Sequence, residues 1–395
     1  MRVGSPLVRG NICMNTHPVG LAVAVRQQID YVRQRGSIPG GAATVLVVGG
    51  STGYGLASRM TAAFGCGAVT VGVSVERPGQ PERAGSPGWY NNRAFDREAH
   101  AAGLSAVTIE QDAFADDTKD QVVAALRKMG RKIDLVIYSL ASPMRTDPVE
   151  GVEYRSVLKA VADSYVGATV DMMTGQLGAC TIGTATPEEI TGTVKVMGGE
   201  DWARWIRQLL QADVLAPGCR TLAYSYIGPE FSHAIYRHGT IGYAKEHLEK
   251  TGVEIDLLLR QAGVKGRAWV SVNKALVTRA SAVIPGISLY MACLFRVMKE
   301  KGVHEGCVEQ VERLFRDFLY AGGAVPVDSE NRIRLDDWEM REDVQAEVNR
   351  RMDLITSDNL AEMADLAGLR HDFLEAHGFD VAGVDYAAEV DPVAG

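Results

Sequence analysis

The sequence predicts an α/β protein built on a doubly wound parallel sheet, with helices on both faces of the sheet. Three observations lead to this prediction. Short apolar runs rich in β-branched residues alternate with helical segments along much of the 395-residue chain. The first of these runs stops at a glycine-rich turn that opens a helix. Two stretches are longer than this pattern requires, and they predict a large insertion after the fourth strand and a helical extension at the C-terminus.

The strands are predicted from runs that stay apolar at successive positions, because a parallel strand covered on both faces has no solvent-facing side. The six runs are 44–48, 68–75, 105–109, 134–138, 221–226 and 267–272. Helical segments lie between them, such as 117–129, and a leading helix is expected over 21–35.

The connection between the fourth and fifth strands, 143–220, is far longer than one crossover helix. It contains polar β-like pieces and an amphipathic helix over 200–211. Trp202 and Trp205 lie on the apolar stripe of that helix and are expected to pack in the core. The tail, 299–395, is expected to add acidic helices after the sheet is complete. Its two acidic stretches, 339–347 and 358–365, are expected to be solvated helix faces.

Composition and charge narrow the possible partners. The net charge of −8 argues against nucleic acid and anionic membranes. The six cysteines show neither C-x-x-C nor metal-ligand spacing with histidine, so we expect reduced thiols in a cytoplasmic protein and no metal site. No signal peptide is evident at the start of the sequence. The most apolar window, 280–298, is interrupted by Pro285 and Gly286, and we expect a buried core helix there with no membrane insertion.

The glycine-rich turn follows the first strand. Gly49, Gly53 and Gly55 have the spacing G-x-x-x-G-x-G, which is typical of short-chain dehydrogenase-type Rossmann folds. Glycines allow a sharp turn and the close approach of a pyrophosphate, and the helix that follows offers free N–H groups to the phosphates. This pattern indicates an enzyme that binds a dinucleotide.

The second strand run is followed by Glu76, which predicts a preference for NADH over NADPH. An acidic residue there can accept both ribose hydroxyls of NAD and repel the 2′-phosphate of NADP. The spacing from Gly55 to Glu76 is close to the roughly 20 residues expected. The neighbouring Arg77 leaves open a contact with a 2′-phosphate.

Tyr236 and Lys245 are candidates for the tyrosine and lysine of a dehydrogenase-type site, in which the tyrosine donates to the substrate oxygen and the lysine lowers its pKa. Nine helical steps amount to about 900°, so one continuous helix would place them on opposite faces. Gly239 and Gly242 lie between them, and Thr240 is a favourable N-cap. If Tyr236 precedes the helix and Lys245 lies within it, both can reach one site. The spacing alone leaves open a core tyrosine and a surface lysine.

The chain resembles the trans-2-enoyl-CoA reductase family, which includes the V-type enoyl-acyl-carrier-protein reductases and is marked by Tyr-x8-Lys. The resemblance extends over the whole chain. The segments that carry it are 9–10, 16–20, 49–55, 111–114, 138–143, 194–202, 236–245, 304–307 and 383–386.

The resemblance implies a role for each matched residue. Tyr236 would be the proton donor, Lys245 would hold the nicotinamide ribose, and Tyr226 would contact the acyl thioester. The implied cofactor contacts are Gly49, Gly50, Ser51, Thr52, Gly53 and Tyr54 for the pyrophosphate, Val75 and Glu76 for the adenosine ribose, Asp112 and Ala113 for the adenine, Leu140 and Ala141 for the nicotinamide ribose, and Lys245, Leu276, Val277 and Thr278 for the remainder. Asp112 and Leu140 follow predicted strands, at the sheet edge where open α/β sheets bind ligands.

The implied reaction is the NADH-dependent reduction of the trans-2 double bond of an enoyl thioester, in fatty acid or related acyl-chain biosynthesis. The acyl group could be carried by CoA or by an acyl carrier protein, and the enzyme is expected to be a monomer or weak homodimer. Two alternatives stay open. One is another dehydrogenase-type oxidoreductase acting on a carbonyl or an unusual unsaturated substrate, and the other is a non-catalytic NAD-binding sensor.

We expect residues 1–395 to form one elaborated domain. Residues 44–142 and 221–298 would form the dinucleotide-binding core. Residues 143–220 and 299–395 would form a lid and cover over the substrate.

Overall fold

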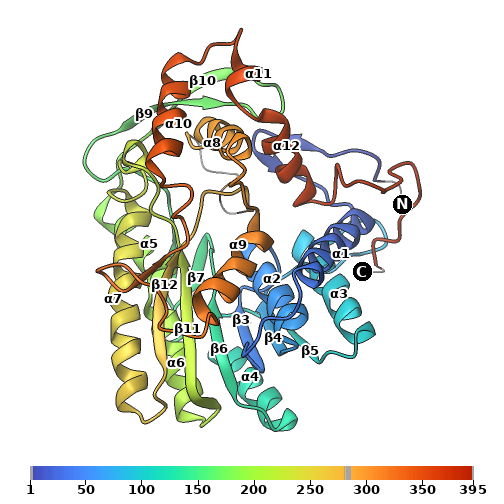
Figure 1. Ribbon diagram of the computed structural model, residues 1–395, viewed down its shortest axis with the longest axis vertical. Coiled ribbons are helices and arrows are strands. Elements are labelled where there is room, and N and C mark those ends of the chain that lie inside the picture. The colour runs from blue at the N-terminus through green and yellow to red at the C-terminus, as the bar shows by residue number, and fades with distance from the viewer. Residues whose placement is uncertain (1–2, 280, 282–285, 394–395) are drawn as a thin grey trace.

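A central sheet of seven strands organises the computed structural model, which describes residues 3–279, 281 and 286–393 (Figure 1). All neighbouring strands in it run parallel. Their order across the sheet is β13-β12-β11-β6-β3-β4-β5. Their bounds are β3 (Thr44–Val48), β4 (Val69–Ser74), β5 (Ala106–Glu110), β6 (Ile133–Tyr138), β11 (Leu215–Ser225), β12 (Arg267–Val272) and β13 (Arg332–Arg334).

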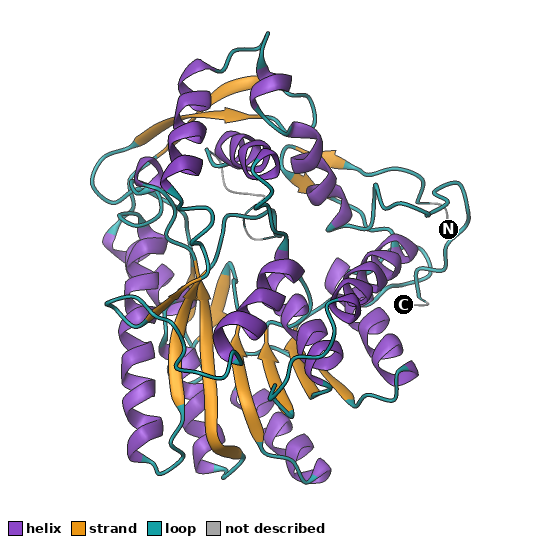
Figure 2. Cartoon of the chain, viewed as in Figure 1, coloured by secondary structure: helices purple, strands orange, loops and turns teal. Residues whose placement is uncertain are grey.

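Three two-stranded hairpins and a set of helices complete the fold (Figure 2). The hairpins are β1 (Val8–Arg9) with β2 (Ile12–Cys13), β7 (Met144–Thr146) with β8 (Glu153–Arg155), and β9 (Tyr165–Val170) with β10 (Leu177–Ile182). The helices are α1 (Pro18–Gln34), α2 (Gly53–Met60), α3 (Pro87–Ala101), α4 (Asp116–Met129), α5 (Pro187–Met197), α6 (Glu200–Gln211), α7 (Thr240–Gln261), α8 (Ser288–Glu300), α9 (Cys307–Arg313), α10 (Glu342–Leu354), α11 (Leu360–Met363) and α12 (Leu366–Glu375).

The two faces of the sheet are covered by different helices, because alternate side chains of a strand point to opposite faces. Val45 and Val47 of β3 join a buried cluster with α1, α2, α3 and α9. Leu46 and Val48 join another with α4, α6 and α7. The predicted doubly wound fold is confirmed.

The six predicted strands are present, but the prediction that the sheet is complete before residue 299 is wrong. β13 comes from the C-terminal extension and pairs in parallel with β12. The strand has three residues, and only Ile333 among them is apolar, so it lacks the apolar run by which the others were recognised. Its two arginines are held by ion pairs, Arg332 with Asp328 at 2.9 Å and Arg334 with Asp336 at 2.7 Å.

The long insertion contributes to both the sheet layers and the region beyond them. The predicted helix over 200–211 is α6, and its Trp202 and Trp205 are fully buried against the sheet, as expected. The β9–β10 hairpin instead lies with α8, α10 and α12 at the top of the molecule (Figure 1).

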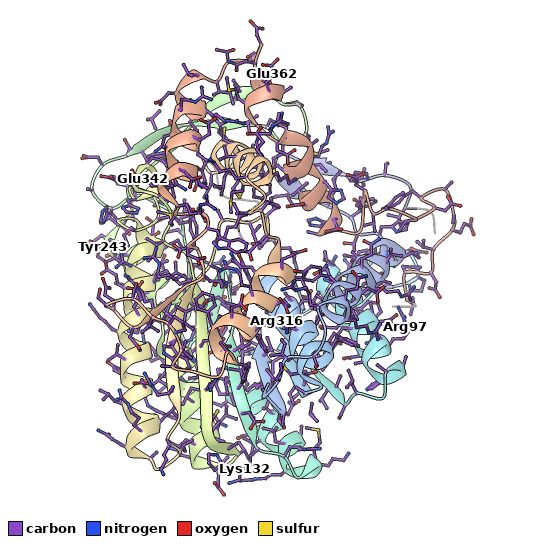
Figure 3. The ribbon with its side chains drawn as sticks, viewed as in Figure 1. Arg97, Lys132, Tyr243, Arg316, Glu342 and Glu362 are labelled. Atoms are coloured by element: carbon purple, nitrogen blue, oxygen red, sulfur yellow. The ribbon has the colours of Figure 1, made fainter. Side chains whose placement is uncertain are left out.

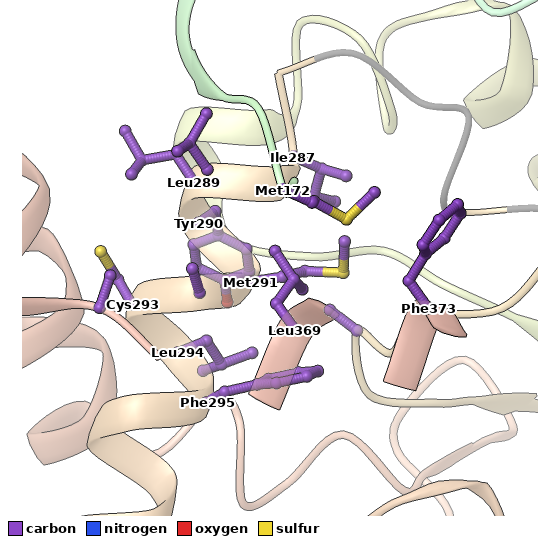
Figure 4. Close-up of a cluster of buried hydrophobic side chains, with 14 of the residues drawn as sticks. Met172, Ile287, Leu289, Tyr290, Met291, Cys293, Leu294, Phe295, Leu369 and Phe373 are labelled. Carbon is purple, nitrogen blue, oxygen red and sulfur yellow. The ribbon is translucent and has the colours of Figure 1, made fainter. Parts of the chain in front are cut away.

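A hydrophobic cluster around α8 fills this upper part (Figure 4). Consecutive residues from Ser288 to Phe295 are buried, which is typical of a helix surrounded by protein on all sides. Met172 of the insertion and Phe373 of α12 pack into the same cluster. The buried helix predicted from residue 280 begins at Ser288. Of its first residues, 280 and 282–285 lie outside those the structure describes.

Segments near the two ends of the chain pack against each other. The His17 ring caps α1 by accepting the Gly20 N–H at 3.0 Å, and it meets the Tyr386 ring edge-on at 4.8 Å. The Tyr386 hydroxyl donates to the carbonyl of Gly378 and accepts the Val381 N–H. Residues 16–20 and 383–386 thus stabilise one another. Within the described ranges, no helix is both long enough and apolar enough to span a membrane.

The junction between β3 and α2 is a very close backbone contact. Gly49 has a φ of +86°, a conformation that side chains disfavour. A Cβ atom on Gly55 would lie 1.9 Å from the carbonyl oxygen of Gly49. Only glycine therefore lets α2 start this close to the end of β3.

We expect Gly55→Ala to lower the melting temperature, measured by circular dichroism. Overpacking of this kind costs about 1–3 kcal/mol, which exceeds the gain of about 0.5–1 kcal/mol from alanine in a helix. Gly252→Ala in α7 is the matched control, because its Cβ would lie 3.4 Å from the Trp202 ring, an ordinary contact. Equal melting temperatures for Gly55→Ala and the wild type would contradict the close approach.

Candidate active site

The N-terminus of α2 is open at the carboxyl edge of the sheet. The N–H groups of Gly49 and Gly50 donate to the carbonyl of Val73, at 2.8 and 3.2 Å, and attach the loop to β4. Thr52 is the N-cap residue, with extended backbone, and within the described chain no side chain caps the helix. The first N–H groups of α2 are therefore available to an anion, as the glycine pattern predicts.

Glu76 lies beside this loop with its side chain only 6% exposed. Its two carboxylate oxygens accept hydrogen bonds from Ser51 at 2.6 Å and Ser86 at 2.5 Å. Arg279 is an ion-pair partner at 3.5 Å, and Asn91 donates to the Ser51 carbonyl. Glu76 is thus firmly oriented. Sequence reasoning missed Ser86: its position before a proline marks it as the N-cap of α3, but its hydroxyl turns to Glu76 instead. The neighbouring Val75 is 70% exposed.

Asp112 and Ala113 follow β5, and a buried network holds the turn they form. Lys119 and the Trp205 indole both donate to the carbonyl of Ala113, each at 3.1 Å. Lys119 also pairs with buried Asp201 at 3.0 Å. Leu140 is half-buried and Ala141 exposed just after β6.

Two predicted cofactor residues contact the segment after β12. The Tyr54 hydroxyl lies 2.9 Å from the Lys274 carbonyl and 2.7 Å from Gln310 Oε1, so its side chain points into the protein and only its backbone belongs to the glycine loop. The Thr278 methyl group lies 3.4 Å from where a Cβ of Gly53 would be. The segment Leu276, Val277 and Thr278 therefore returns to the start of α2.

Tyr236 lies in the turn before α7, four residues before the helix begins at Thr240, and Lys245 lies in the second turn of that helix. A Cβ on Gly242 would lie 2.3 Å from the Tyr236 carbonyl oxygen, so glycine lets the tyrosine turn pack directly onto the helix. The predicted arrangement of Tyr236 before the helix and Lys245 within it is confirmed. The predicted N-cap is one residue off, because Gly239 is the N-cap and the Thr240 hydroxyl instead donates to the Val157 carbonyl.

Tyr226, at the end of β11, and Tyr236 are adjacent. Their ring centroids are 5.2 Å apart at an angle of 81°. The Lys245 ammonium group donates to the carbonyl of Tyr224, two residues before Tyr226, at 3.1 Å. All three residues therefore meet at the end of β11. Tyr243 is 45% exposed on the outer side of α7 (Figure 3), which excludes it as the partner of Lys245.

Burial determines the protonation of these groups. It raises the pKa of Tyr236, and the negative charge of Glu339 raises it further. It also raises the pKa of Tyr226. Burial lowers the pKa of Lys245 to about 8, with Glu249 opposing the shift. The expected lowering of the tyrosine pKa by the lysine is therefore wrong for this arrangement. At neutral pH both phenols therefore keep their protons.

Known protein families match along most of the chain. Residues 83–320 match the trans-2-enoyl-CoA reductase catalytic region, and residues 3–81 match the NAD(P)H binding domain of trans-2-enoyl-CoA reductase. Residues 327–390 match a domain described as the enoyl reductase FAD binding domain. The chain belongs to the trans-2-enoyl-CoA reductase family.

Relatives of this reductase family member align over almost their full length. A trans-2-enoyl-CoA reductase (NADH) from Treponema denticola is 55% identical over 98% of both chains. An enoyl-acyl-carrier-protein reductase (NADH) from Flavobacterium johnsoniae is 52% identical over 98% of this chain and 97% of its own. A crystal structure of the Treponema denticola trans-2-enoyl-CoA reductase in complex with NAD superposes with a TM-score of 0.95, covering 99% of this chain and 98% of that chain.

Sequence reasoning failed for one acidic residue of this reductase. Glu339 was expected on a solvated helix face, yet it is fully buried. It accepts hydrogen bonds from Tyr226 at 3.3 Å and Tyr290 at 2.6 Å. The acidic residues that follow, such as Glu342, are exposed on α10 as expected. Nothing in the acidic stretch distinguishes Glu339, because its burial depends on contacts with distant segments.

We expect Lys245→Met to raise the melting temperature at pH 7, although it removes a site residue. In the wild type, burial lowers the pKa of the Lys245 ammonium group from 10.5, its ordinary value, to about 8 in the folded protein. Below pH 8 the folded state bears the whole cost of that burial, and above 10.5 neither state is charged. The difference in melting temperature between Lys245→Met and the wild type should therefore become smaller as the pH rises from 8 to 10.5.

The control is Lys250→Met, which alters an exposed lysine of the same helix. Thermal unfolding at pH 7 and pH 10 compares the three proteins. A Lys245→Met protein that melts below the wild type at pH 7 would show that the buried ammonium group is compensated by its surroundings.

Proposed function

We propose that this chain reduces the trans-2 double bond of an enoyl thioester with NADH, giving the saturated acyl thioester. The observation that carries the proposal is the meeting of Tyr226, Tyr236 and Lys245 at the carboxyl edge of the sheet. The relatives named as NADH-dependent trans-2-enoyl-CoA and enoyl-acyl-carrier-protein reductases support the same reaction.

The cofactor region fits a dinucleotide. A side chain on Gly55 would collide with the Gly49 carbonyl, so the loop and the start of α2 pack tightly together. No side chain caps the start of α2 in the described chain, so its first N–H groups can bind the phosphates. We propose that the loop from Gly49 to Tyr54 holds the pyrophosphate and that Glu76 holds the adenosine ribose. The other proposed contacts are Val75, Asp112, Ala113, Leu140, Ala141, Lys245, Leu276, Val277 and Thr278.

In the proposed mechanism both tyrosines act as neutral phenols and Lys245 acts as an ammonium ion, as their pKa shifts favour near neutral pH. NADH supplies the hydride that the β-carbon of the enoyl thioester receives. Negative charge then develops on the thioester oxygen of the substrate. Tyr236, a neutral phenol, donates its hydrogen bond or proton to that oxygen, with Tyr226 beside it. The α-carbon then takes up a proton from water, which completes the saturated acyl thioester. Lys245 holds the nicotinamide ribose, and its positive charge stabilises the enolate.

The carrier and the setting of the enzyme are also proposals. We propose that the substrate is carried by CoA or by an acyl carrier protein, and that the segments beyond the sheet edge from 143–220 and 299–395 cover its acyl chain. All six cysteines lie in described segments and are free thiols, which supports a cytoplasmic location. We propose a monomer or weak homodimer.

The reaction is tested by following NADH absorbance with crotonyl-CoA and with a longer enoyl-CoA. We expect the wild-type protein to oxidise NADH when an enoyl-CoA is present. We expect Tyr236→Phe to lower kcat about 10²–10³-fold, the typical effect of removing one oxyanion donor. Tyr243→Phe, on the exposed side of α7, is the control and should keep wild-type kcat. A wild-type kcat in Tyr236→Phe would contradict the assignment of Tyr236 as the proton donor. Tight NADH binding without turnover would instead favour a sensor.

Removing the charge of Glu76 should shift the cofactor preference. In Glu76→Gln the 2′-phosphate of NADPH no longer faces a carboxylate, and Arg279, now without its acidic partner, can attract it. We expect the ratio of kcat/KM for NADPH to that for NADH to rise on the order of tenfold, about 1.4 kcal/mol. Glu82→Gln alters an exposed acid of the same loop and should leave the ratio unchanged. An unchanged ratio in Glu76→Gln would remove Glu76 from the ribose site.

A further inference from the structure

Glu339 brings together three hydrogen-bond donors from three separate elements. One carboxylate oxygen accepts the hydroxyls of Tyr226 at 3.3 Å and Tyr290 at 2.6 Å, and the other accepts the N–H of Ala275 at 2.7 Å. These donors come from the end of β11, from α8, and from the segment after β12. Glu339 itself lies between β13 and α10, and its side chain is fully buried.

A buried carboxylate needs such donors, since leaving it unpaired in an apolar interior is costly. Burial raises the pKa of Glu339, while the Tyr290 hydrogen bond and the charge of nearby Lys274 oppose that shift. The Lys274 ammonium group is itself buried and donates to the carbonyl of Ala275. The carboxylate therefore has a complete set of polar partners.

The contact with Tyr226 connects this carboxylate to the proposed chemistry. The Tyr226 hydroxyl donates its single proton to Glu339 at 3.3 Å, so this contact sets the direction of that hydroxyl. The Tyr226 ring meets the Tyr236 ring edge-on, so a shift of the Tyr226 hydroxyl also moves the ring that borders the proton donor. If Glu339 only stabilised the fold, it would not need a hydrogen bond to a side chain of the candidate site.

We propose that Glu339 is a positioning residue, which holds the Tyr226 hydroxyl in place beside Tyr236 during turnover. The inference rests on the proposed function, because that function places Tyr236 at the thioester oxygen and Tyr226 beside it. Glu339 does not touch the substrate in this arrangement. Its effect on the reaction passes through Tyr226.

A double-mutant cycle on the full-length protein tests the proposal, with crotonyl-CoA and NADH as substrates. Glu339→Gln keeps the shape of the side chain and one oxygen for the Ala275 N–H, but it no longer offers Tyr226 a carboxylate. We expect kcat to fall about tenfold or more, while the dissociation constant of NADH, from its fluorescence, stays within about twofold. In the Tyr226→Phe background the same change should alter kcat by less than about twofold.

Each outcome bears on one proposal. If the losses of the two single variants multiply in the double variant, Glu339 does not act through Tyr226 and the inference is overturned. It is also overturned if Glu339→Gln keeps wild-type kcat. A wild type that binds NADH but does not reduce crotonyl-CoA contradicts the proposed function instead.

Glu312→Gln is the matched control. Glu312 is also a buried carboxylate of the C-terminal half, but it pairs with Arg35 and Arg316, away from the two tyrosines. It should lower the melting temperature and leave kcat unchanged. Should Glu339→Gln fail to fold, Glu339→Asp takes its place in the cycle. The shorter side chain draws the carboxylate away from Tyr226, so kcat should again fall. In the Tyr226→Phe background, Glu339→Asp should change kcat by less than about twofold.

Discussion

The close approach of α2 to the end of β3 is the constraint on which the rest of the site depends. Because Gly55 has no side chain, the first turn of α2 lies directly against the Gly49 carbonyl. This places the free N–H groups of α2 at the carboxyl end of β3, inside the sheet between β6 and β4. The segment with Thr278 then returns to the same point from β12. The glycine loop proposed for the phosphates and the segment from Leu276 to Thr278 therefore lie together at this one contact.

The parts that sequence could predict are those that depend on neighbouring residues. The short apolar runs identified six strands, and the glycine spacing located the loop before α2. The glycines between Tyr236 and Lys245 gave the interrupted geometry of that pair, although the helix starts after Gly239 rather than Thr240. β13 was missed because three residues with one apolar side chain carry no pattern. Glu339 was missed because its partners are Tyr226, Ala275 and Tyr290, which folding alone brings to it.

Burial of ionisable groups is a second theme of this molecule. Lys245, Lys274 and Glu339 are held within protein rather than at its surface, and the phenols of Tyr226 and Tyr236 are kept neutral by the same surroundings. Electrostatic interactions are stronger in such a region than in water. Donors that are already oriented there need little reorganisation when charge develops on a substrate.

The late position of β13 in the chain has a consequence for biosynthesis. Until residues 332–334 have left the ribosome, β12 forms the outer strand of the sheet, with its backbone N–H and C=O groups unpaired on one side. Open edges of this kind pair readily with other chains. A nascent chain of this enzyme therefore exposes one strand edge that the finished protein covers, from the synthesis of β12 until β13 pairs with it.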